Sequence, residues 1–250
     1  MPVPVAAGCN AACVGCISSQ PDGVVPPAQQ RLDFVPDVGE IVEIAVPHLQ
    51  SAPAAMVSFG QGCEGEPLLQ AELIAEAIRQ IRRRTDRGTI HLNTNGSDPD
   101  ALQRLCEAGL DSVRISLNAT YEPWYTAYYR PRGYGFDDVV ASFRVAADHG
   151  CFVSMNYLTF PGVNDAAPEV ESLERFLAVV PLHMIQWRNL NIDPDLYLDL
   201  LHIPDDLPAV GLQSWLCALR ERYPQLRHGS LNPPKELWAG GEWAEVFRAG

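Results

Sequence analysis

Three cysteines near the start of the chain have a spacing that could bind a metal centre. Cys9, Cys13 and Cys16 follow the pattern C-x3-C-x2-C on what is expected to be one loop. Cysteine thiolates are soft ligands that hold iron, and a cube-shaped iron–sulfur cluster needs converging sulfurs. Four cysteines would close such a cluster, whereas three leave one iron free for an outside ligand, as a catalytic zinc site keeps an open position. The spacing therefore predicts an iron–sulfur cluster with Cys9, Cys13 and Cys16 as its metal ligands.

Two other interpretations of these cysteines stay open at this point. The pair Cys13 and Cys16 alone is typical of a thiol–disulfide motif, although that leaves Cys9 without a role. Cys63 could complete a structural zinc site, although zinc gives no reason for the polar motifs at the other strand ends. The chain has 7 cysteines, an odd number, and one tight cluster among scattered cysteines indicates a reducing, cytoplasmic setting.

Composition excludes several classes of protein. The 250 residues are 47% hydrophobic and 20% charged, as in an ordinary globular protein and unlike a disordered chain or a small disulfide scaffold. No apolar run approaches the ~18 residues of a membrane span, and no secretory signal is found before Gly8. A net charge of -13 repels phosphodiester backbones, so a nucleic-acid partner is disfavoured. The first expected strand lies almost at Met1, so an upstream segment could be missing.

The elements that must position the cysteines alternate between strand and helix, with a period of roughly thirty-odd residues, the size of a βαβ unit. Strands are expected at residues 3–7, 55–59, 89–94, 112–117, 152–158 and 183–187. Helices are expected from residue 37 until Pro47 ends or kinks the first, and then at 67–85, 99–108, 122–129, 136–149, 169–180, 210–222 and 242–248. Alternation implies parallel strands. The expected fold is α/β, a partial (βα)6 TIM-type barrel over residues 1–193, with a short C-terminal helical extension at 194–250 packing on it.

In parallel barrels the active site forms at the carboxyl ends of the strands, so the polar motifs there are candidates for function. Gly62-Cys63-Glu64-Gly65-Glu66-Pro67 follows the second expected strand, and Asn93-Thr94-Asn95-Gly96 ends the third. Alternation places Arg114, Ser116 and Asn118 on one face of the fourth strand. The fifth strand carries Asn156, and the sixth carries Gln186 and Arg188, whose guanidinium could clamp a carboxylate.

Together these features resemble the radical S-adenosylmethionine (SAM) superfamily over the chain from Val3 to about Asp193. In that family SAM binds the free iron through its amino and carboxylate groups. An electron from the cluster cleaves SAM to methionine and a 5′-deoxyadenosyl radical, which abstracts a hydrogen atom from a substrate. The resemblance implies an enzyme with one 4Fe–4S cluster and SAM as cofactors. It also implies an unknown substrate and an electron donor such as flavodoxin or ferredoxin.

The resemblance also implies roles for the residues at the strand ends. Gly65 and Glu66 match the family's Gly-Gly-Glu-Pro motif and would meet the methionine end of SAM, although Glu64 stands where the first glycine usually is. The SAM nucleoside or carboxylate would lie along Thr94, Ser116, Asn118 and Asn156, and Arg188 would hold a carboxylate of SAM or of the substrate. The segment from Asn156 to Asp165 is similar to the family branch that includes molybdenum-cofactor biosynthesis protein A.

One departure from the family concerns adenine packing. The residue before the third cysteine is often aromatic there and covers the adenine, but this chain has Gly15. The aromatic run from Trp124 to Tyr134 is interpreted as core or lid packing. The alternative to an enzyme is a non-catalytic zinc- or cluster-binding structural module on a barrel scaffold.

Overall fold

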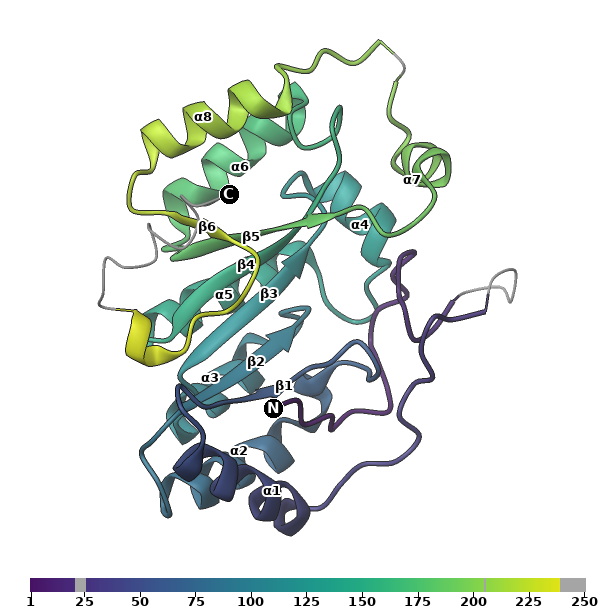
Figure 1. Ribbon diagram of the computed structural model, residues 1–250. Coiled ribbons are helices and arrows are strands. Elements are labelled where there is room, and N and C mark those ends of the chain that lie inside the picture. Colours follow the sequence, from purple (N-terminus) through teal and green to yellow (C-terminus); the bar gives the residue numbers. More distant parts are fainter. Residues whose placement is uncertain (21–25, 205, 239–250) are drawn as a thin grey trace.

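The sheet that carries the candidate site is parallel throughout. A computed structural model describes residues 1–20, 26–204 and 206–238. Within these residues, six strands form one sheet in the order β1-β2-β3-β4-β5-β6, each parallel to its neighbours (Figure 1). They are β1 (Met56–Phe59), β2 (Thr89–Thr94), β3 (Ser112–Leu117), β4 (Phe152–Thr159), β5 (Met184–Asn189) and β6 (Arg227–Gly229). The predicted α/β class and parallel partial barrel are confirmed.

Helices make the crossovers between the strands. They are α1 (Val38–Ser51), η2 (Pro67–Gln70), α2 (Ala71–Arg82), α3 (Pro99–Ala108), α4 (Glu122–Tyr129), α5 (Phe136–Asp148), α6 (Ala167–Val179), α7 (Pro194–Leu201), α8 (Leu212–Arg222) and η3 (Lys235–Leu237). Helices α1, α2, α3 and α5 contact one another in chain order along the outside of the sheet. Most expected boundaries lie within two residues of the observed ones, because capping residues such as Asp37 and Asp98 begin these helices.

The first expected helix does not end at Pro47, which was one of the two outcomes predicted there. The helix continues through Pro47 to Ser51. Proline lacks an N–H and removes only one helical hydrogen bond. The buried face of α1, which includes Ile41, Ala45 and Leu49, packs against the core on both sides of the proline and keeps the helix together.

The first expected strand, residues 3–7, was wrong as a strand. Only Pro2 forms an isolated parallel bridge, to Ser58. The amides of Val5 and Ala6 instead donate to the Glu64 carboxylate, at 2.6 and 2.9 Å. The prolines on either side of Val3 have no N–H and cannot donate to a neighbouring strand. The Glu64 side chain therefore accepts hydrogen bonds from this segment in place of a strand backbone.

The segment after Asp193 contains more structure than the two expected helices. Helix α7 and strand β6 were not predicted, and the expected helix at 242–248 lies outside the described residues. Strand β6 pairs with β5 and extends the sheet. The chain after β6 then runs to the amino-terminal ends of the strands, where the Lys235 amide bonds Thr89 and Trp238 stacks on Phe152. The division of the chain at residue 193 stays a prediction.

Alternation along the strands separates an apolar outer face from a polar inner one. Val113, Ile115 and Leu117 of β3 are at most 1% exposed and pack in the hydrophobic core. Arg114 and Ser116, between them, line a cavity inside the barrel. On β3, the polar residues within the strand therefore face an interior space.

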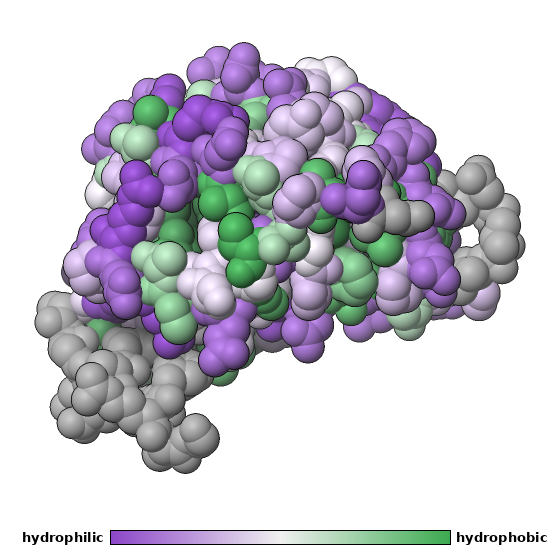
Figure 2. All heavy atoms as spheres, turned by 90° about the horizontal axis from the view of Figure 1, so that it is seen from above, coloured by the Kyte–Doolittle hydropathy of each residue, from purple (hydrophilic) through white to green (hydrophobic). Residues whose placement is uncertain are grey.

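One face of the molecule is mostly polar. Figure 2 shows the face that is uppermost in Figure 1, where polar side chains surround a small apolar area. No helix among the described residues is long and apolar enough to cross a membrane.

Candidate functional site

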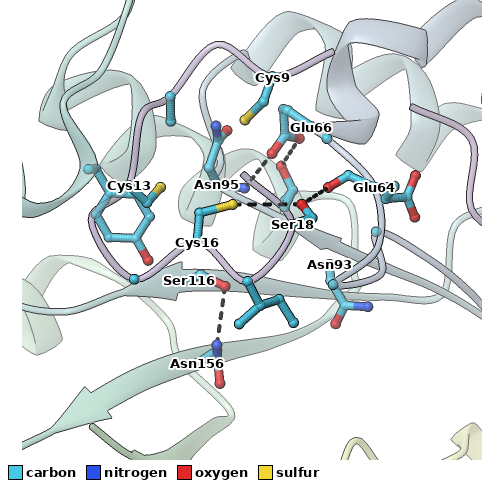
Figure 3. Close-up of a pocket in the computed structure, with 18 of the residues that line it drawn as sticks. Cys9, Cys13, Cys16, Ser18, Glu64, Glu66, Asn93, Asn95, Ser116 and Asn156 are labelled. Carbon is cyan, nitrogen blue, oxygen red and sulfur yellow. Dashed lines mark hydrogen bonds between the residues drawn. The ribbon is translucent and has the colours of Figure 1, made fainter. Parts of the chain in front are cut away.

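The three cysteines lie on a loop that is tied to the end of helix α4. The amides of Ala12 and Val14 donate to the carbonyl oxygens of Tyr129 and Tyr128, each at 3.0 Å. The last carbonyls of a helix have no partner within the helix, so α4 can accept these two bonds from the loop. Cys9, Cys13 and Cys16 all line a cavity of about 490 Å³ at the carboxyl-terminal ends of the strands. In Figure 3 they lie across this pocket from Ser116 and Asn156.

A second loop, between β1 and η2, packs directly against the backbone of the cysteine loop. The Gly65 amide donates to the Ala6 carbonyl at 2.6 Å, and the Glu66 amide donates to the Gly8 carbonyl at 2.8 Å. A Cβ at position 65 would lie closer than 3.0 Å to the carbonyl group of Gly8 and 3.1 Å from the amide nitrogen of Cys9. Only glycine allows this approach. The contact explains why the sequence has glycine directly before Glu66.

Glu64 stabilises the same junction with its side chain. Its carboxylate accepts from the amides of Val5, Ala6 and Gln61, and the residue is 4% exposed. Burial raises the pKa of Glu64, while the backbone donors lower it. Glu64 therefore holds the segment that leads into Cys9, a role that differs from that of the glycine usual at this position in the resembling motif.

Glu66, in the loop between β1 and η2, is buried. Its carboxylate accepts from the Thr94 hydroxyl at 2.5 Å, the Asn95 amide at 2.8 Å and the Leu68 amide at 3.0 Å. Burial raises the pKa of Glu66 to about 7, against the opposing effect of these hydrogen bonds. Thr94 was predicted to lie along the nucleoside. It lines the cavity, but its hydroxyl donates to Glu66 and thereby orients that carboxylate.

On the opposite wall, a chain of polar contacts joins three strands. The Asn156 side-chain amide donates to the Ser116 hydroxyl at 3.3 Å, a contact drawn in Figure 3. The Nε of Arg188 donates to the Asn156 Oδ1 at 3.1 Å. The three side chains therefore orient one another, and all three line the cavity.

The cavity collects nine of the ten predicted site residues. These are Cys9, Cys13, Cys16, Gly65, Glu66, Thr94, Ser116, Asn156 and Arg188. Asn118 is the exception. It is fully buried, and its amide donates to the Trp124 carbonyl and to the Tyr197 hydroxyl behind the cavity wall. Alternation put Asn118 on the correct face of the extended chain, but β3 ends at Leu117 and the chain turns before the side chain reaches the cavity.

The thiols fit an iron–sulfur cluster in their chemistry and placement. Burial raises the pKa of Cys9 and of Cys13, and the two neighbouring thiols raise that of Cys13 further. A bound cationic metal centre would offset this penalty by stabilising the thiolates. Among the described residues, no three His, Cys, Asp or Glu side chains are close enough to hold a single metal ion. Cys63, the proposed fourth zinc ligand, does not line the described cavity.

Several residues of the site had no signal in the sequence. The guanidinium of Arg31 donates to the Cys16 sulfur at 3.4 Å and to the Ser18 hydroxyl at 3.2 Å, although Arg31 lies in a Pro/Gln-rich loop. Asn191 donates to the Gly15 carbonyl at 3.2 Å from 176 residues away. Tyr128, part of the aromatic run interpreted as packing, lines the cavity. Such contacts depend on the tertiary fold alone.

Comparison with known proteins identifies the family. Residues 3–173 match the model of the radical SAM superfamily. The chain therefore belongs to the radical SAM superfamily, whose members are enzymes that use a 4Fe–4S cluster and SAM. A search of curated proteins gave no match.

Solved structures show the same fold at low sequence identity. The chain is similar to HydG, a maturase of the [FeFe]-hydrogenase (15% identity, TM-score 0.58, covering 91% of this chain and 50% of that one). It is similar to methylornithine synthase, PylB (17% identity, TM-score 0.59, covering 91% of this chain and 63% of that one). It is also similar to Streptococcus suis SuiB bound to S-adenosylmethionine (11% identity, TM-score 0.60, covering 92% of this chain and 50% of that one). The chain spans about half to two-thirds of these proteins, and the likeness concerns the fold.

Proposed function

We propose that this protein cleaves SAM reductively in the cavity at the strand ends and directs the resulting radical to a substrate. The observation that carries the proposal is the convergence of the three cysteines, the Gly65–Glu66 loop and the Ser116–Asn156 pair on one cavity in a radical SAM domain. When bound, the cluster and SAM supply the electron and the 5′-deoxyadenosyl radical that abstracts hydrogen from a substrate.

Within this proposal, the chain's own residues hold and orient the cofactors. Cys9, Cys13 and Cys16 ligate iron. The loop at Gly65 and Glu66 meets the methionine end of SAM. Ser116 and Asn156 offer a hydroxyl and an amide along the nucleoside, and their mutual hydrogen bond orients both groups before SAM binds. Asn118 takes no part in this contact, because its side-chain amide donates to the Trp124 carbonyl.

Tyr128 supplies a surface for the adenine. It takes the place of the aromatic residue that the family often has before the third cysteine, where this chain has Gly15. A Cβ at position 15 would collide with the Tyr128 hydroxyl, so this tyrosine fills the space beside Gly15. Its ring lines the same cavity as the cysteines. Tyr128→Leu should weaken SAM binding several-fold in a calorimetric titration, while Tyr223→Leu, on the C-terminal side of α8, should leave it unchanged. Equal SAM affinity in both variants would show that the adenine binds elsewhere.

Floor residues confine the reaction. Asn232, after β6, bonds His91, Gln186 and Ser154 and crosses the interior of the barrel. These hydrogen bonds connect β2, β4 and β5 through one side chain. Confinement suits a reactive alkyl radical, which must be kept from solvent.

The electron donor and family branch are part of the same proposal. Enzymes of this family act on a substrate with a reductant, and we propose a donor such as flavodoxin or ferredoxin in the cytoplasm. The likeness of Asn156 and of Gly162-Val163-Asn164-Asp165 to molybdenum-cofactor biosynthesis protein A supports that branch. In the structure, Asn164 and Asp165 accept from the amides of Phe160 and Gly162 and close the loop after β4.

The test is anaerobic iron and sulfide analysis, followed by dithionite reduction with SAM. Wild type should hold one 4Fe–4S cluster and form 5′-deoxyadenosine. Cys13→Ala should lose both, whereas Cys217→Ala, an exposed cysteine outside the site, should keep both. A colourless, zinc-loaded protein that leaves SAM intact would instead support the non-catalytic structural module.

A further inference from the structure

Two arginines face the inner part of the cavity side by side. Arg114 Nη1 donates to the Gln186 Oε1 at 2.8 Å, and Arg188 Nη2 donates to the same oxygen at 3.3 Å. Both side chains line the cavity. Sharing one amide oxygen therefore brings two guanidinium groups, one from β3 and one from β5, together on the inner face of the sheet.

Neither guanidinium has an acidic partner. Among the described residues, no ion pair involves Arg114 or Arg188. The side chains that they do contact, Gln186 and Asn156, are neutral amides. Two adjacent, partly buried cations without a counter-ion are unfavourable, and in a protein of net charge -13 they are not part of a general basic surface.

The two glutamates of the cavity do not neutralise this pair. Glu64 accepts from three backbone amides at the start of the cysteine loop. Glu66 accepts from Thr94, Leu68 and Asn95. Both carboxylates are therefore committed to the wall that carries the cysteines, and the arginine wall stays positively charged.

One donor of the pair has no partner at all. The Nε of Arg114 is buried and makes no hydrogen bond. A buried donor without a partner costs free energy, so the protein contacts of the Arg114 guanidinium do not satisfy it fully. Burial, and then the charge of Arg188, lower the pKa of Arg114 to about 10, so the group stays protonated at neutral pH. Both features favour an anion beside Arg114.

We propose that the substrate carries an anionic oxygen group, a carboxylate or a phosphate, that binds to Arg114 and Arg188. Guanidinium groups present parallel N–H donors that match both of these oxyanions. Arg114 precedes Ser116 by two residues on β3 and faces the same side. It therefore lies deeper in the barrel than the strand ends, and its partner Gln186 also bonds Asn232. The inference rests on the proposed function, because it assigns the SAM cavity's inner part to the substrate.

The test measures anion binding and SAM binding on the same anaerobically reconstituted protein. Inorganic phosphate and malonate are titrated by calorimetry into protein saturated with SAM. We expect at least one of them to bind, with an affinity that falls as KCl is raised. Arg114→Gln and Arg188→Gln should each weaken this binding by about tenfold or more, as expected for loss of a charge-assisted hydrogen bond. A preference for phosphate or for malonate identifies which oxyanion the site takes.

Control variants separate charge at this site from general effects. Arg175→Gln removes a charge from the exposed face of α6 and should bind the anion as wild type does. Arg114→Lys and Arg188→Lys retain the charge and should keep part of the affinity for the anion. Their partial binding would distinguish loss of charge from a loss of folding in the glutamine variants.

Three outcomes would overturn the inference. The first is that neither phosphate nor malonate binds. The second is that the glutamine variants bind the anion as tightly as wild type does. The third is that these variants lose as much affinity for SAM as they lose for the anion. The last result would assign the pair to the carboxylate of SAM. Formation of 5′-deoxyadenosine is measured in parallel, so failure to cleave SAM contradicts the proposed function separately from the anion site.

Discussion

Replacing Gly65 by alanine should displace the cysteine loop and prevent cluster binding. The added Cβ would lie closer than 3.0 Å to the carbonyl group of Gly8, a separation that real Cβ atoms essentially never show. The obstructing atoms are backbone and cannot rotate away. Because Gly65 has no positive φ, the cost arises from this contact rather than from backbone strain.

The size of the effect follows from what must move. Separating the two loops breaks the hydrogen bonds from Gly65 to Ala6 and from Glu66 to Gly8. Each such bond contributes about 0.5–1.5 kcal/mol, and overpacking adds about 1–3 kcal/mol. The expected loss in the free energy of unfolding is therefore about 2–6 kcal/mol. Native domains are stable by about 5–15 kcal/mol, so the variant is expected to relieve the contact by a local displacement of the Cys9 backbone rather than by complete unfolding.

The assay is the iron content per chain after anaerobic reconstitution, with circular dichroism as the measure of folding. Gly65→Ala should remain largely folded and hold far less iron than wild type. Gly8→Ala is the matched control in the same junction, since the nearest atom to its new Cβ is a Leu69 methyl carbon at 4.0 Å. Wild-type iron content and stability in Gly65→Ala would refute this account of how the two loops fit together.

Three further predictions concern groups around the site and beneath it. Arg31→Met removes a cation that donates to the Cys16 sulfur, so the cluster's reduction potential should become more negative in an EPR-monitored redox titration, and an unchanged potential would contradict this. The buried Glu169 carboxylate of α6 accepts from Thr120, Tyr121 and Tyr157, so Glu169→Gln leaves buried donors without a full acceptor. It should lower the free energy of unfolding in urea by about 1–3 kcal/mol, and an unchanged midpoint would argue against this role of Glu169. Burial lowers the pKa of His91 to about 3, so the unfolded chain binds more protons than the native one below pH 6.5. As pH falls below 6.5, this group should lower the free energy of unfolding of wild type by up to about 1.4 kcal/mol per pH unit. His91→Gln should show a shallower pH dependence of the unfolding free energy, and equal slopes would refute the prediction.

The fold could be predicted from local patterns where these are strong. The strands at 89–94 and 112–117 were predicted at their observed bounds, because buried aliphatic residues alternate with inward polar ones there. Strand β6 has no such pattern. It is three residues long, Arg-His-Gly, and forms only because β5 offers an unpaired edge. The helix α7 was missed even though Asp193 caps it and Pro194 begins it, both of which are sequence signals.

The site shows the same division. Cysteine spacing and the positions of polar residues at strand ends located the cavity, because parallel strands bring their carboxyl ends to one edge. The partners of these residues could not be derived in the same way. Thr94 is oriented toward Glu66, and Glu64 replaces a missing strand ladder, because of packing between loops that are remote in sequence. Asn118 shows the limit of alternation, which holds only while the strand continues.

EPR spectroscopy of the anaerobically reconstituted, dithionite-reduced protein, before and after addition of SAM, tests the central claim most directly. If Cys9, Cys13 and Cys16 hold one 4Fe–4S cluster with an open iron, SAM should change the cluster's EPR spectrum, and Tyr128→Leu should require more SAM to do so. A cluster signal that SAM leaves unaltered, or a protein that holds no iron, would contradict the claim.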